Sequence, residues 1–442
     1  MPQKFHALLY DELKLLISKD SVGVRRIERA LFTYSFIPCK FFSPIIIGHH
    51  HFREKVTFRI AVFQPRIFIR GGGERNMFEV FSRINRKHEV KIFCAYYSPV
   101  GYKTERTLNI EGLKTGRQNA IPGYGPVFLS CVAESAKRIS RFNPDAVIVN
   151  SGYEFVKMLS NRCKATIIPY VGSTDWYKTL NFLEHELIWR LPYFSKLVSV
   201  VASSSTATNN YVRPLRIIRG RDSTLRKCKI NICVSKYVSR FLHQLDPKIR
   251  TKVAYPGVDH ETFKPTFKDQ NYLMNVTRIH PNKNPMLAAK TVKDTNYRLR
   301  IYANMETGIK PYHDYYEELL ATKGPNVQIF MDKPEATIVH ALQACSIFLS
   351  PARNEGIPNV DLEAMACGKF VIGHRSGGQI EFLKDGGITC GDNPKEWQQH
   401  VIQLMQNAEK RKELGKQAYR ASLQFTWDKT ARVIQETIEE YA

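Results

Sequence analysis

The chain contains the segment Glu355-Gly356-Ile357-Pro358-Asn359-Val360-Asp361-Leu362-Glu363, which continues as Ala364-Met365-Ala366-Cys367-Gly368-Lys369. The residues before it, Ser346-Ile347-Phe348-Leu349-Ser350, are typical of a buried strand. Pro358 stands where a first helical turn is expected to open, because the N–H that proline lacks has no partner there. The segment therefore predicts a strand, a loop and a helix, and the free N–H groups and positive dipole end at that helix N-terminus favour a phosphate.

Two glutamates bracket this segment. Glu355 lies on the predicted loop, and Glu363 lies about two turns further along the predicted helix. Their carboxylates could reach different hydroxyl-rich parts of one elongated ligand, such as a sugar joined through a diphosphate to a ribose. For these two residues alone the simpler interpretation is favoured, in which Glu363 is a solvated helix residue and residues 356–358 form a turn.

The spacing of the two glutamates and the Glu-Ala-Met-Ala-Cys-Gly-Lys continuation resemble the retaining glycosyltransferases of family 4, a large GT-B class. This resemblance implies an α/β protein with the GT-B fold, in which two Rossmann-like parallel-sheet domains face a central cleft. It implies that Glu355 contacts the donor sugar and that Glu363 contacts the nucleoside ribose. The donor-binding residues that this motif implies are Gly356, Ile357, Pro358, Asn359 and Glu363.

Two cations occur in the segment Tyr272–Asn284. Arg278 is expected at the end of a strand and Lys283 at the start of the next helix, so both could converge on the same diphosphate. The segment is similar to the family pattern Gly-Arg-Leu-x-Pro-x-Lys-Gly, although threonine and asparagine replace the glycines at positions 277 and 284. The resemblance implies that Arg278 and Lys283 stabilise the departing nucleoside diphosphate, and that with Glu355 they are the catalytic residues.

The first half of the chain alternates predicted strands and helices, which favours a parallel sheet covered by helices on both faces. Phe58–Phe63 reads as the first strand and Val90–Cys94 as the second. Between them, the glycines of Arg70–Arg75 are expected to form a loop whose positive φ angles let a ligand approach the backbone. This loop resembles the Gly-Gly-Ala-Glu-Arg loop of family 4, which implies that Gly72 and Gly73 bind the donor.

The loop after the predicted strand Ala165–Val171 is expected to open toward the same cleft, at the carboxyl end of that strand. In the family members of closest appearance, the mannosyltransferases that build lipid-linked oligosaccharides, the pattern here is Tyr-x-His-x-Pro-Asp. When this chain is aligned on Tyr170 and Asp175, the histidine position, a sugar contact, falls on Gly172. Gly172, Ser173 and Asp175 are therefore predicted acceptor or sugar residues, and a plain loop is the alternative for Ser173 and Asp175.

The chain divides into four predicted parts. Residues 1–56 form an N-terminal extension that is expected to pack on the next domain or to lie at a membrane interface, because prolines and a lysine interrupt its apolar stretch. Residues 57–257 are predicted to form the Rossmann-like acceptor domain, and residues 258–424 the Rossmann-like nucleotide-sugar domain. The resemblance implies that residues 425–442 form a terminal helix that crosses back to the first domain.

Charge is distributed unevenly along the chain, whose net charge is +24. Residues 57–257 carry 33 Lys or Arg against 13 Asp or Glu, a net +20, whereas residues 258–442 carry 23 of each. This asymmetry predicts an anionic partner, and an anionic membrane surface or a phospholipid- or polyprenyl-linked acceptor would satisfy it. Nucleic acid is not expected, because the basic residues are scattered and form no nucleic-acid-binding motif. The alternative is a surface that is basic for solubility alone.

The 442 residues, 43% of them hydrophobic, are enough for two domains with substantial cores. We expect no membrane-spanning helix and no secretory signal. Nine cysteines are scattered without a Cys-x-x-Cys pair, which indicates reduced thiols in the cytoplasm and no zinc site. The sequence contains no Asp-x-Asp motif, and we expect neither a metal nor a cofactor besides the GDP- or UDP-linked donor.

These observations predict a retaining hexosyltransferase that transfers a sugar such as mannose from a nucleotide donor to a lipid-linked or other membrane-associated acceptor. It would work peripherally on the cytoplasmic face of a membrane. Two alternatives stay open. A GT-B sugar-nucleotide epimerase would use the donor without an acceptor, and a catalytically silent GT-B binding protein, conceivable because of Gly172, would release no diphosphate.

Overall fold

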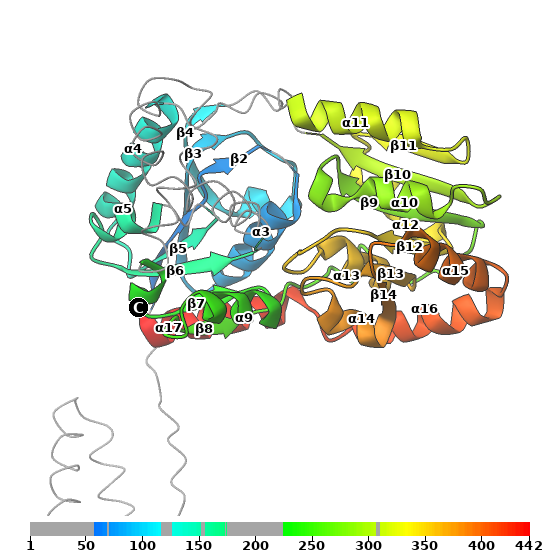
Figure 1. The fold of residues 1–442 in the computed structure, drawn as a ribbon. Helices are drawn as coiled ribbons and strands as arrows, with labels where there is room; N and C mark the ends of the chain where they lie inside the picture. Colours follow the sequence, from blue (N-terminus) through cyan, green and yellow to red (C-terminus); the bar gives the residue numbers. More distant parts are fainter. Residues whose placement is uncertain are drawn as a thin grey trace, which may run out of the picture. The chain divides into compact units, whose positions relative to one another are not determined.

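The computed structural model describes residues 57–68, 70–115, 126–151, 155–172, 174, 224–305 and 310–442. The predicted N-terminal extension, residues 1–56, lies outside them. Two parallel sheets with their helices organise the described residues (Figure 1). We call the part built on the first sheet, together with the last helix, the N-terminal lobe. The part built on the second sheet, residues 258–425, is the C-terminal lobe.

The N-terminal lobe contains an eight-stranded sheet among the described residues. Its strands are β1 (Arg59–Phe63), β2 (Arg66–Ile67), β3 (Glu89–Tyr97), β4 (Asn109–Thr115), β5 (Ala146–Asn150), β6 (Thr166–Val171), β7 (Asn231–Cys233) and β8 (Thr251–Val253). The order is β2-β3-β1-β5-β6-β7-β8, with β4 also paired to β3, and these pairings are parallel. β1 and β5 are apolar and buried almost throughout, as expected for strands covered on both faces.

The helices described in this lobe are α3 (Gly72–Ile84), the 3₁₀ turn η1 (Lys103–Thr107), α4 (Pro126–Phe142), α5 (Val156–Ser160) and α9 (Lys236–Leu245). α3 packs on the core through apolar side chains at helical spacing, including Met77, Phe78 and Phe81. The last helix, α17 (Trp427–Tyr441), adds Trp427 and Ile434 to the same core. The end of the chain therefore belongs structurally to the N-terminal lobe.

The C-terminal lobe contains the described strands β9 (Tyr272–Arg278), β10 (Arg298–Asn304), β11 (Val327–Met331), β12 (Ile347–Ser350), β13 (Phe370–His374) and β14 (Gly387–Cys390). Their order is β11-β10-β9-β12-β13-β14, and the pairings are parallel. The first strand in sequence, β9, thus lies inside the sheet, with β10 on one side and β12 on the other. Ligands of open α/β sheets bind beyond the carboxyl ends of strands where the order reverses, which here are those of β9 and β12.

Helices cover both faces of this second sheet. Along β12, Ile347 and Leu349 enter one core and Phe348 enters the other, because successive side chains of a strand point to opposite faces. The first core receives α10 (Pro285–Thr291), α11 (Lys310–Thr322) and α15 (Pro394–Met405), and the second receives α12 (Glu335–Ala344), α13 (Asn359–Ala366), α14 (Ile380–Gly386) and α16 (Ala408–Ser422). The 3₁₀ turn η4 (Pro281–Lys283) precedes α10.

The predicted fold class, two parallel-sheet α/β lobes, is confirmed. Four strands escape the sequence pattern: β2 has two residues, β8 and β14 are short, and β4 has only Ile110 and Leu113 as large apolar residues, at a spacing that does not alternate. The loop predicted at Arg70–Arg75 is wrong. α3 already begins at Gly72, and none of the glycines 71–73 has a positive φ.

None of the described helices is both long and apolar enough to span a bilayer. The cysteines within the described residues are buried free thiols.

Candidate functional site

The predicted catalytic lysine and glutamate are in contact. Lys283 Nζ donates a hydrogen bond to Glu355 Oε1 over 2.6 Å. Lys283 ends η4, which follows β9, and Glu355 lies on the loop after β12. Because β9 and β12 pair directly, their carboxyl ends bring the two loops together. Both side chains are largely shielded from water, so this charge-assisted hydrogen bond is stronger than one on the open surface.

His280 lies between the two predicted cations in sequence and close to both in space. Its Nδ1 accepts a hydrogen bond from the N–H of Asn282 over 3.0 Å. Burial lowers the pKa of His280 to about 4, the charges of Arg278 and Lys283 add to this effect, and Glu355 opposes it. His280 is therefore neutral near pH 7. All three predicted catalytic residues thus act electrostatically on His280, and Arg278 is exposed at the end of β9.

The two glycines that the family has near Arg278 and Lys283 are replaced without backbone strain at the second position. Asn284 joins η4 to α10 with φ 51° and ψ 43°, which is the left-handed region. Glycine reaches this region freely, and asparagine is among the few other residues that tolerate it. Thr277 lies in the extended backbone of β9, where a side chain is acceptable. The departure from the family pattern therefore keeps the turn that carries Lys283.

A glycine pair supports the Glu355 loop from behind. Gly378 N–H donates to the Glu355 carbonyl over 2.8 Å, and a Cβ on Gly378 would lie only 1.7 Å from the carbonyl oxygen of Gly356. Gly377 has a φ of +79°, and its Cβ would lie 2.5 Å from the Glu355 carbonyl oxygen. These glycines therefore let two backbones touch, which fixes the position of the loop that carries Glu355.

The start of α13 faces the N-terminal lobe. α13 begins at Asn359 with Pro358 as its N-cap, one residue later than the sequence predicts, and Ile357 is buried in the core. Asn359 Nδ2 donates to Asn76 Oδ1 over 2.7 Å and to the Gly72 carbonyl oxygen over 3.3 Å. The predicted anion site at the α13 N-terminus therefore lies against the first turns of α3.

Gly72 and Gly73, the predicted donor-binding glycines, form the first turn of α3. A Cβ on Gly72 would lie 3.4 Å from Asn359 Nδ2, whereas a Cβ on Gly73 would meet no described atom within 4 Å. A small residue at position 72 thus allows the close contact between α3 and α13, while Gly73 is not confined by the described residues.

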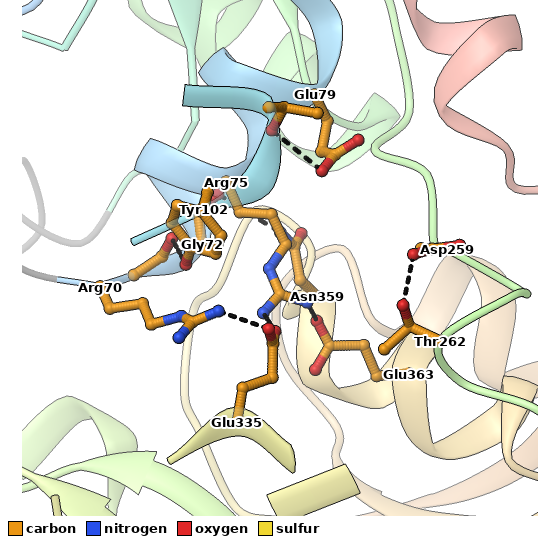
Figure 2. A network of polar contacts seen from close by, with 12 residues as sticks. Arg70, Gly72, Arg75, Glu79, Tyr102, Asp259, Thr262, Glu335, Asn359 and Glu363 are labelled. Carbon is orange, nitrogen blue, oxygen red and sulfur yellow. Dashed lines mark hydrogen bonds and ion pairs between the residues drawn. The ribbon is translucent and has the colours of Figure 1, made fainter. Parts of the chain in front are cut away.

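Glu363 is not a solvated helix residue, so that part of the simpler interpretation is wrong. Its side chain is 10% exposed, and its Oε1 accepts a hydrogen bond from Arg75 Nη1 over 2.5 Å. Arg75 Nη2 also donates to Glu335, and Arg70 donates to the other carboxylate oxygen of Glu335. The Tyr102 ring stacks near both guanidinium groups. Figure 2 shows these five residues converging, and we call them the Arg75 cluster.

The loop after β6 also reaches the C-terminal lobe. A Cβ on Gly356 would lie 2.0 Å from the carbonyl oxygen of Gly172, so the two backbones are in direct contact. Thr174 Oγ1 donates to the Asn354 carbonyl oxygen over 3.4 Å. Gly172, the predicted sugar or acceptor position, thus adjoins the Glu355 loop. The other two predicted residues of this loop, Ser173 and Asp175, lie outside the described residues.

Two family models match the chain over adjoining regions. The model for Glycosyltransferase Family 4 matches residues 70–262, and the model for Glycosyl transferases group 1 matches residues 259–421. Together they cover most of the chain and both lobes. The chain therefore belongs to the glycosyltransferases that these two models describe. The resemblance of the Glu355 and Arg278 motifs is confirmed at the level of the family.

Curated relatives match parts of this glycosyltransferase. An uncharacterized glycosyltransferase of Methanocaldococcus jannaschii is 28% identical over 214 residues, which span 47% of this chain and 59% of that protein. A D-inositol 3-phosphate glycosyltransferase of Paenarthrobacter aurescens is 26% identical over 307 residues, which span 61% of this chain and 72% of that protein.

Solved structures share its fold over a larger part of the chain. HepE from Anabaena, solved in complex with UDP-glucose, superposes with a TM-score of 0.65 at 14% identity, over 87% of this chain and 100% of HepE. Sucrose-phosphate synthase from Thermosynechococcus elongatus gives a TM-score of 0.67 at 14% identity, over 87% and 99% of the two chains. These likenesses establish the GT-B fold of the glycosyltransferase.

Sequence reasoning about this glycosyltransferase missed three residues that lie at the predicted site or contact its neighbours. His280 was detectable, because it stands between Arg278 and Lys283. Arg75 belongs to the glycine segment but carried no sign of a partner 288 residues away. Glu335 gives only a weak signal, an acidic residue after Pro334 at the start of a helix.

Proposed function

We propose that this glycosyltransferase transfers a hexose such as mannose from a GDP- or UDP-linked donor, with retention of anomeric configuration, to a lipid-linked or other membrane-associated acceptor. The single observation that carries the proposal is the contact of Lys283 with Glu355 at the carboxyl ends of β9 and β12. A cation and a carboxylate held together there match the two kinds of group that a sugar diphosphate needs: one for the leaving phosphates and one for the sugar hydroxyls.

The chemistry assigns the cations to the leaving group. Transfer breaks the bond between the anomeric carbon and the donor diphosphate, so negative charge grows on the diphosphate in the transition state. Lys283, Arg278 and the N-terminus of α13 supply preorganised positive charge for it, and such charge is usually the largest contribution to catalysis. Protein groups alone take this role, and no step is routed through a metal.

The two glutamates take the two hydroxyl-bearing ends of the donor. Glu355, fixed by Lys283 and by the backbone of Gly378, accepts hydrogen bonds from the sugar and orients it. Glu363, in the middle of α13, accepts hydrogen bonds from the ribose. In this proposal the backbone at Gly72, Gly73 and residues 356–359 contacts the part of the donor between the sugar and the ribose.

Charge supports an anionic acceptor. Residues 57–257 carry a net +20, from 33 Lys or Arg against 13 Asp or Glu. The relative from Paenarthrobacter aurescens is named for a phosphate-bearing acceptor, inositol 3-phosphate. A phospholipid- or polyprenyl-linked acceptor on the cytoplasmic face of a membrane has the same kind of charge and would explain a peripheral enzyme.

The test is a panel of GDP- and UDP-sugars, scored for thermal stabilisation of the protein and for diphosphate release with and without a membrane extract. We expect one donor to stabilise the protein and to release diphosphate only when the extract is present. The anomeric configuration of the product, measured by NMR, should equal that of the donor.

The same panel separates the alternatives. A sugar-nucleotide epimerase would convert the donor into a second nucleotide sugar without any extract. A silent binding protein would be stabilised by a nucleotide but would never release diphosphate. Inversion of configuration would contradict the retaining assignment while leaving sugar transfer intact.

A further inference from the structure

Arg75 connects the two lobes at the proposed ribose residue. It lies in the first turn of α3, yet its guanidinium reaches Glu363 on α13 and Glu335 on α12 (Figure 2). The Tyr102 ring, 5.2 Å from the guanidinium carbon, and the Phe263 ring, 5.6 Å away, flank it. These contacts hold the guanidinium group in one position, whereas the side chain of a surface arginine is free to adopt several.

The contact controls the charge of Glu363. Burial raises the pKa of Glu363, and Glu335 adds to this effect, whereas Arg75 and, less strongly, Arg70 oppose it. Burial alone would lower the pKa of Arg75, but Glu363 and Glu335 raise it above its ordinary value, so Arg75 stays charged. A buried carboxylate without a cation would tend to take up a proton, and it would then be a poorer acceptor for hydroxyl groups.

Only one of the two carboxylate oxygens of Glu363 takes part in the contact with Arg75. Arg75 Nη1 binds Oε1 of Glu363. The described residues offer no hydrogen bond to the second oxygen, Oε2. A charged carboxylate that has one oxygen anchored, and no described hydrogen-bond donor at the other, is suited to accept hydrogen bonds from two adjacent hydroxyl groups.

We propose that Arg75 is a positioning residue for the nucleotide donor: from the N-terminal lobe it holds the Glu363 carboxylate charged and oriented, so that Oε2 accepts hydrogen bonds from the ribose. This inference rests on the proposed function, in which Glu363 binds the ribose. Its consequence is that the C-terminal lobe does not recognise the ribose by itself. Recognition of the ribose requires α3 to be docked against α13. The hydrogen bonds from Asn359 on α13 to Gly72 and Asn76 on α3 help to hold the two helices together.

The alternative is that Arg75 only ties the lobes together. A matched control exists for this alternative, because Arg240 on α9 forms another ion pair across the lobes, 3.8 Å from Glu381 on α14. Arg240→Met removes that contact with the same substitution and leaves Glu363 untouched. A variant that merely loosens the lobes should therefore behave like Arg240→Met.

The experiment compares the dissociation constants of UDP and GDP with those of their 2′,3′-dideoxy forms, by titration calorimetry on the full chain at pH 7. For the nucleotide that binds, we expect the unmodified protein to prefer the ribose form by about ten-fold or more, because it makes charge-assisted hydrogen bonds. Arg75→Met and Glu363→Gln should both lose this preference while keeping the affinity for the dideoxy form. Arg240→Met should keep it.

A pH series gives a second readout that a structural tie would not move. In Arg75→Met the ribose preference should return as the pH is raised, because Glu363 then loses its proton without help. Arg75→Lys retains a charge but not the two-pronged geometry, so it should show a reduced preference at pH 7. It also serves if Arg75→Met does not fold.

The outcomes distinguish a failure of the role inferred for Arg75 from a failure of the proposed function. An unchanged preference in Arg75→Met, or in Arg75→Lys if only that variant folds, together with a lost preference in Glu363→Gln, overturns the role of Arg75 alone. An unchanged preference in Glu363→Gln overturns the ribose role of Glu363 and the inference with it. If the unmodified protein binds neither UDP nor GDP, the proposed function fails as well.

Discussion

Lys283 Nζ lies 2.6 Å from Glu355 Oε1, although 72 residues separate the two in sequence. Replacing Glu355 with glutamine keeps the shape of the side chain but removes its negative charge. That charge attracts Lys283 and, in the proposed function, strengthens the hydrogen bonds from the donor sugar. We expect Glu355→Gln to lower the transfer rate by about a hundred-fold or more. The melting temperature should fall by less than about 5 °C, because the amide oxygen of glutamine can still accept a hydrogen bond from Lys283 Nζ.

Initial rates of diphosphate release and a melting curve test this. Glu409→Gln, at an exposed position of α16, is the control and should match the unmodified protein in both. Transfer at the full rate in Glu355→Gln would rule out its assigned role.

Gly378 allows two backbones to meet at the site, and this makes a stability prediction. A Cβ there would lie 1.7 Å from the carbonyl oxygen of Gly356, and a backbone atom cannot turn aside as a side chain can. Gly378→Ala should destabilise the protein by roughly 1–3 kcal/mol. Gly73→Ala, in the first turn of α3 with no described atom within 4 Å, should leave stability unchanged or raise it slightly. Urea denaturation of both variants is the measurement, and equal stabilities would contradict the argument.

Asp361 makes stability depend on pH. It is fully buried, and neither carboxylate oxygen has a hydrogen-bond partner of good geometry among the described residues. Burial raises its pKa to about 8, with the charge of Glu355 adding to the effect and Ser350 and Lys283 opposing it. The folded state therefore holds a proton that the unfolded chain releases near pH 4. The stabilisation from this proton is complete below about pH 4 and is lost as the pH rises toward 8.

Asparagine at this position cannot titrate. As the pH rises from 5 to 8, the free energy of unfolding of the unmodified protein should therefore fall relative to that of Asp361→Asn. The expected change in the difference is on the order of a few kcal/mol. Urea denaturation at pH 5, 6.5 and 8 gives the difference. Asp385→Asn, at an exposed position, serves as the comparison. A difference that does not change with pH would show that Asp361 is already charged when folded.

Glu381 caps a helix of the opposite lobe. Its carboxylate on α14 accepts hydrogen bonds from the N–H groups of Lys236, over 3.0 Å, and Tyr237, over 2.5 Å, at the start of α9. The Tyr255 hydroxyl also donates to it, over 2.7 Å. Glu381→Gln should cost roughly 1–2 kcal/mol, because the amide has one acceptor oxygen and no charge to offer these donors.

Tyr255→Phe removes one donor and leaves the cap of α9 in place, so it should cost less than Glu381→Gln. Differential scanning calorimetry of the two variants decides the order. The reverse order would mean that the tyrosine contact, and not the helix cap, holds the lobes at this position.

The fold was readable from the sequence where the pattern is local. Apolar runs such as Ile347–Ser350 predict buried parallel strands, and the alternation of strands and helices predicts their layers, because both depend on near neighbours in the chain. Edge strand β4 escapes prediction for the same reason: its two large apolar residues, Ile110 and Leu113, show no strand periodicity, and only the pairing with β3 defines it.

By itself the sequence determined which residues stand at the carboxyl ends of β9 and β12. Parallel pairing of those strands was enough to bring Lys283 to Glu355. Only the tertiary structure decided that Arg75 binds Glu363 and Glu335, and that the backbone of Gly172 meets Gly356. The physical reason is that these contacts depend on how two lobes, each built on its own sheet, dock. Hydrophobic periodicity fixes which face of a helix is buried, but it does not specify which charged side chains of one lobe meet those of the other.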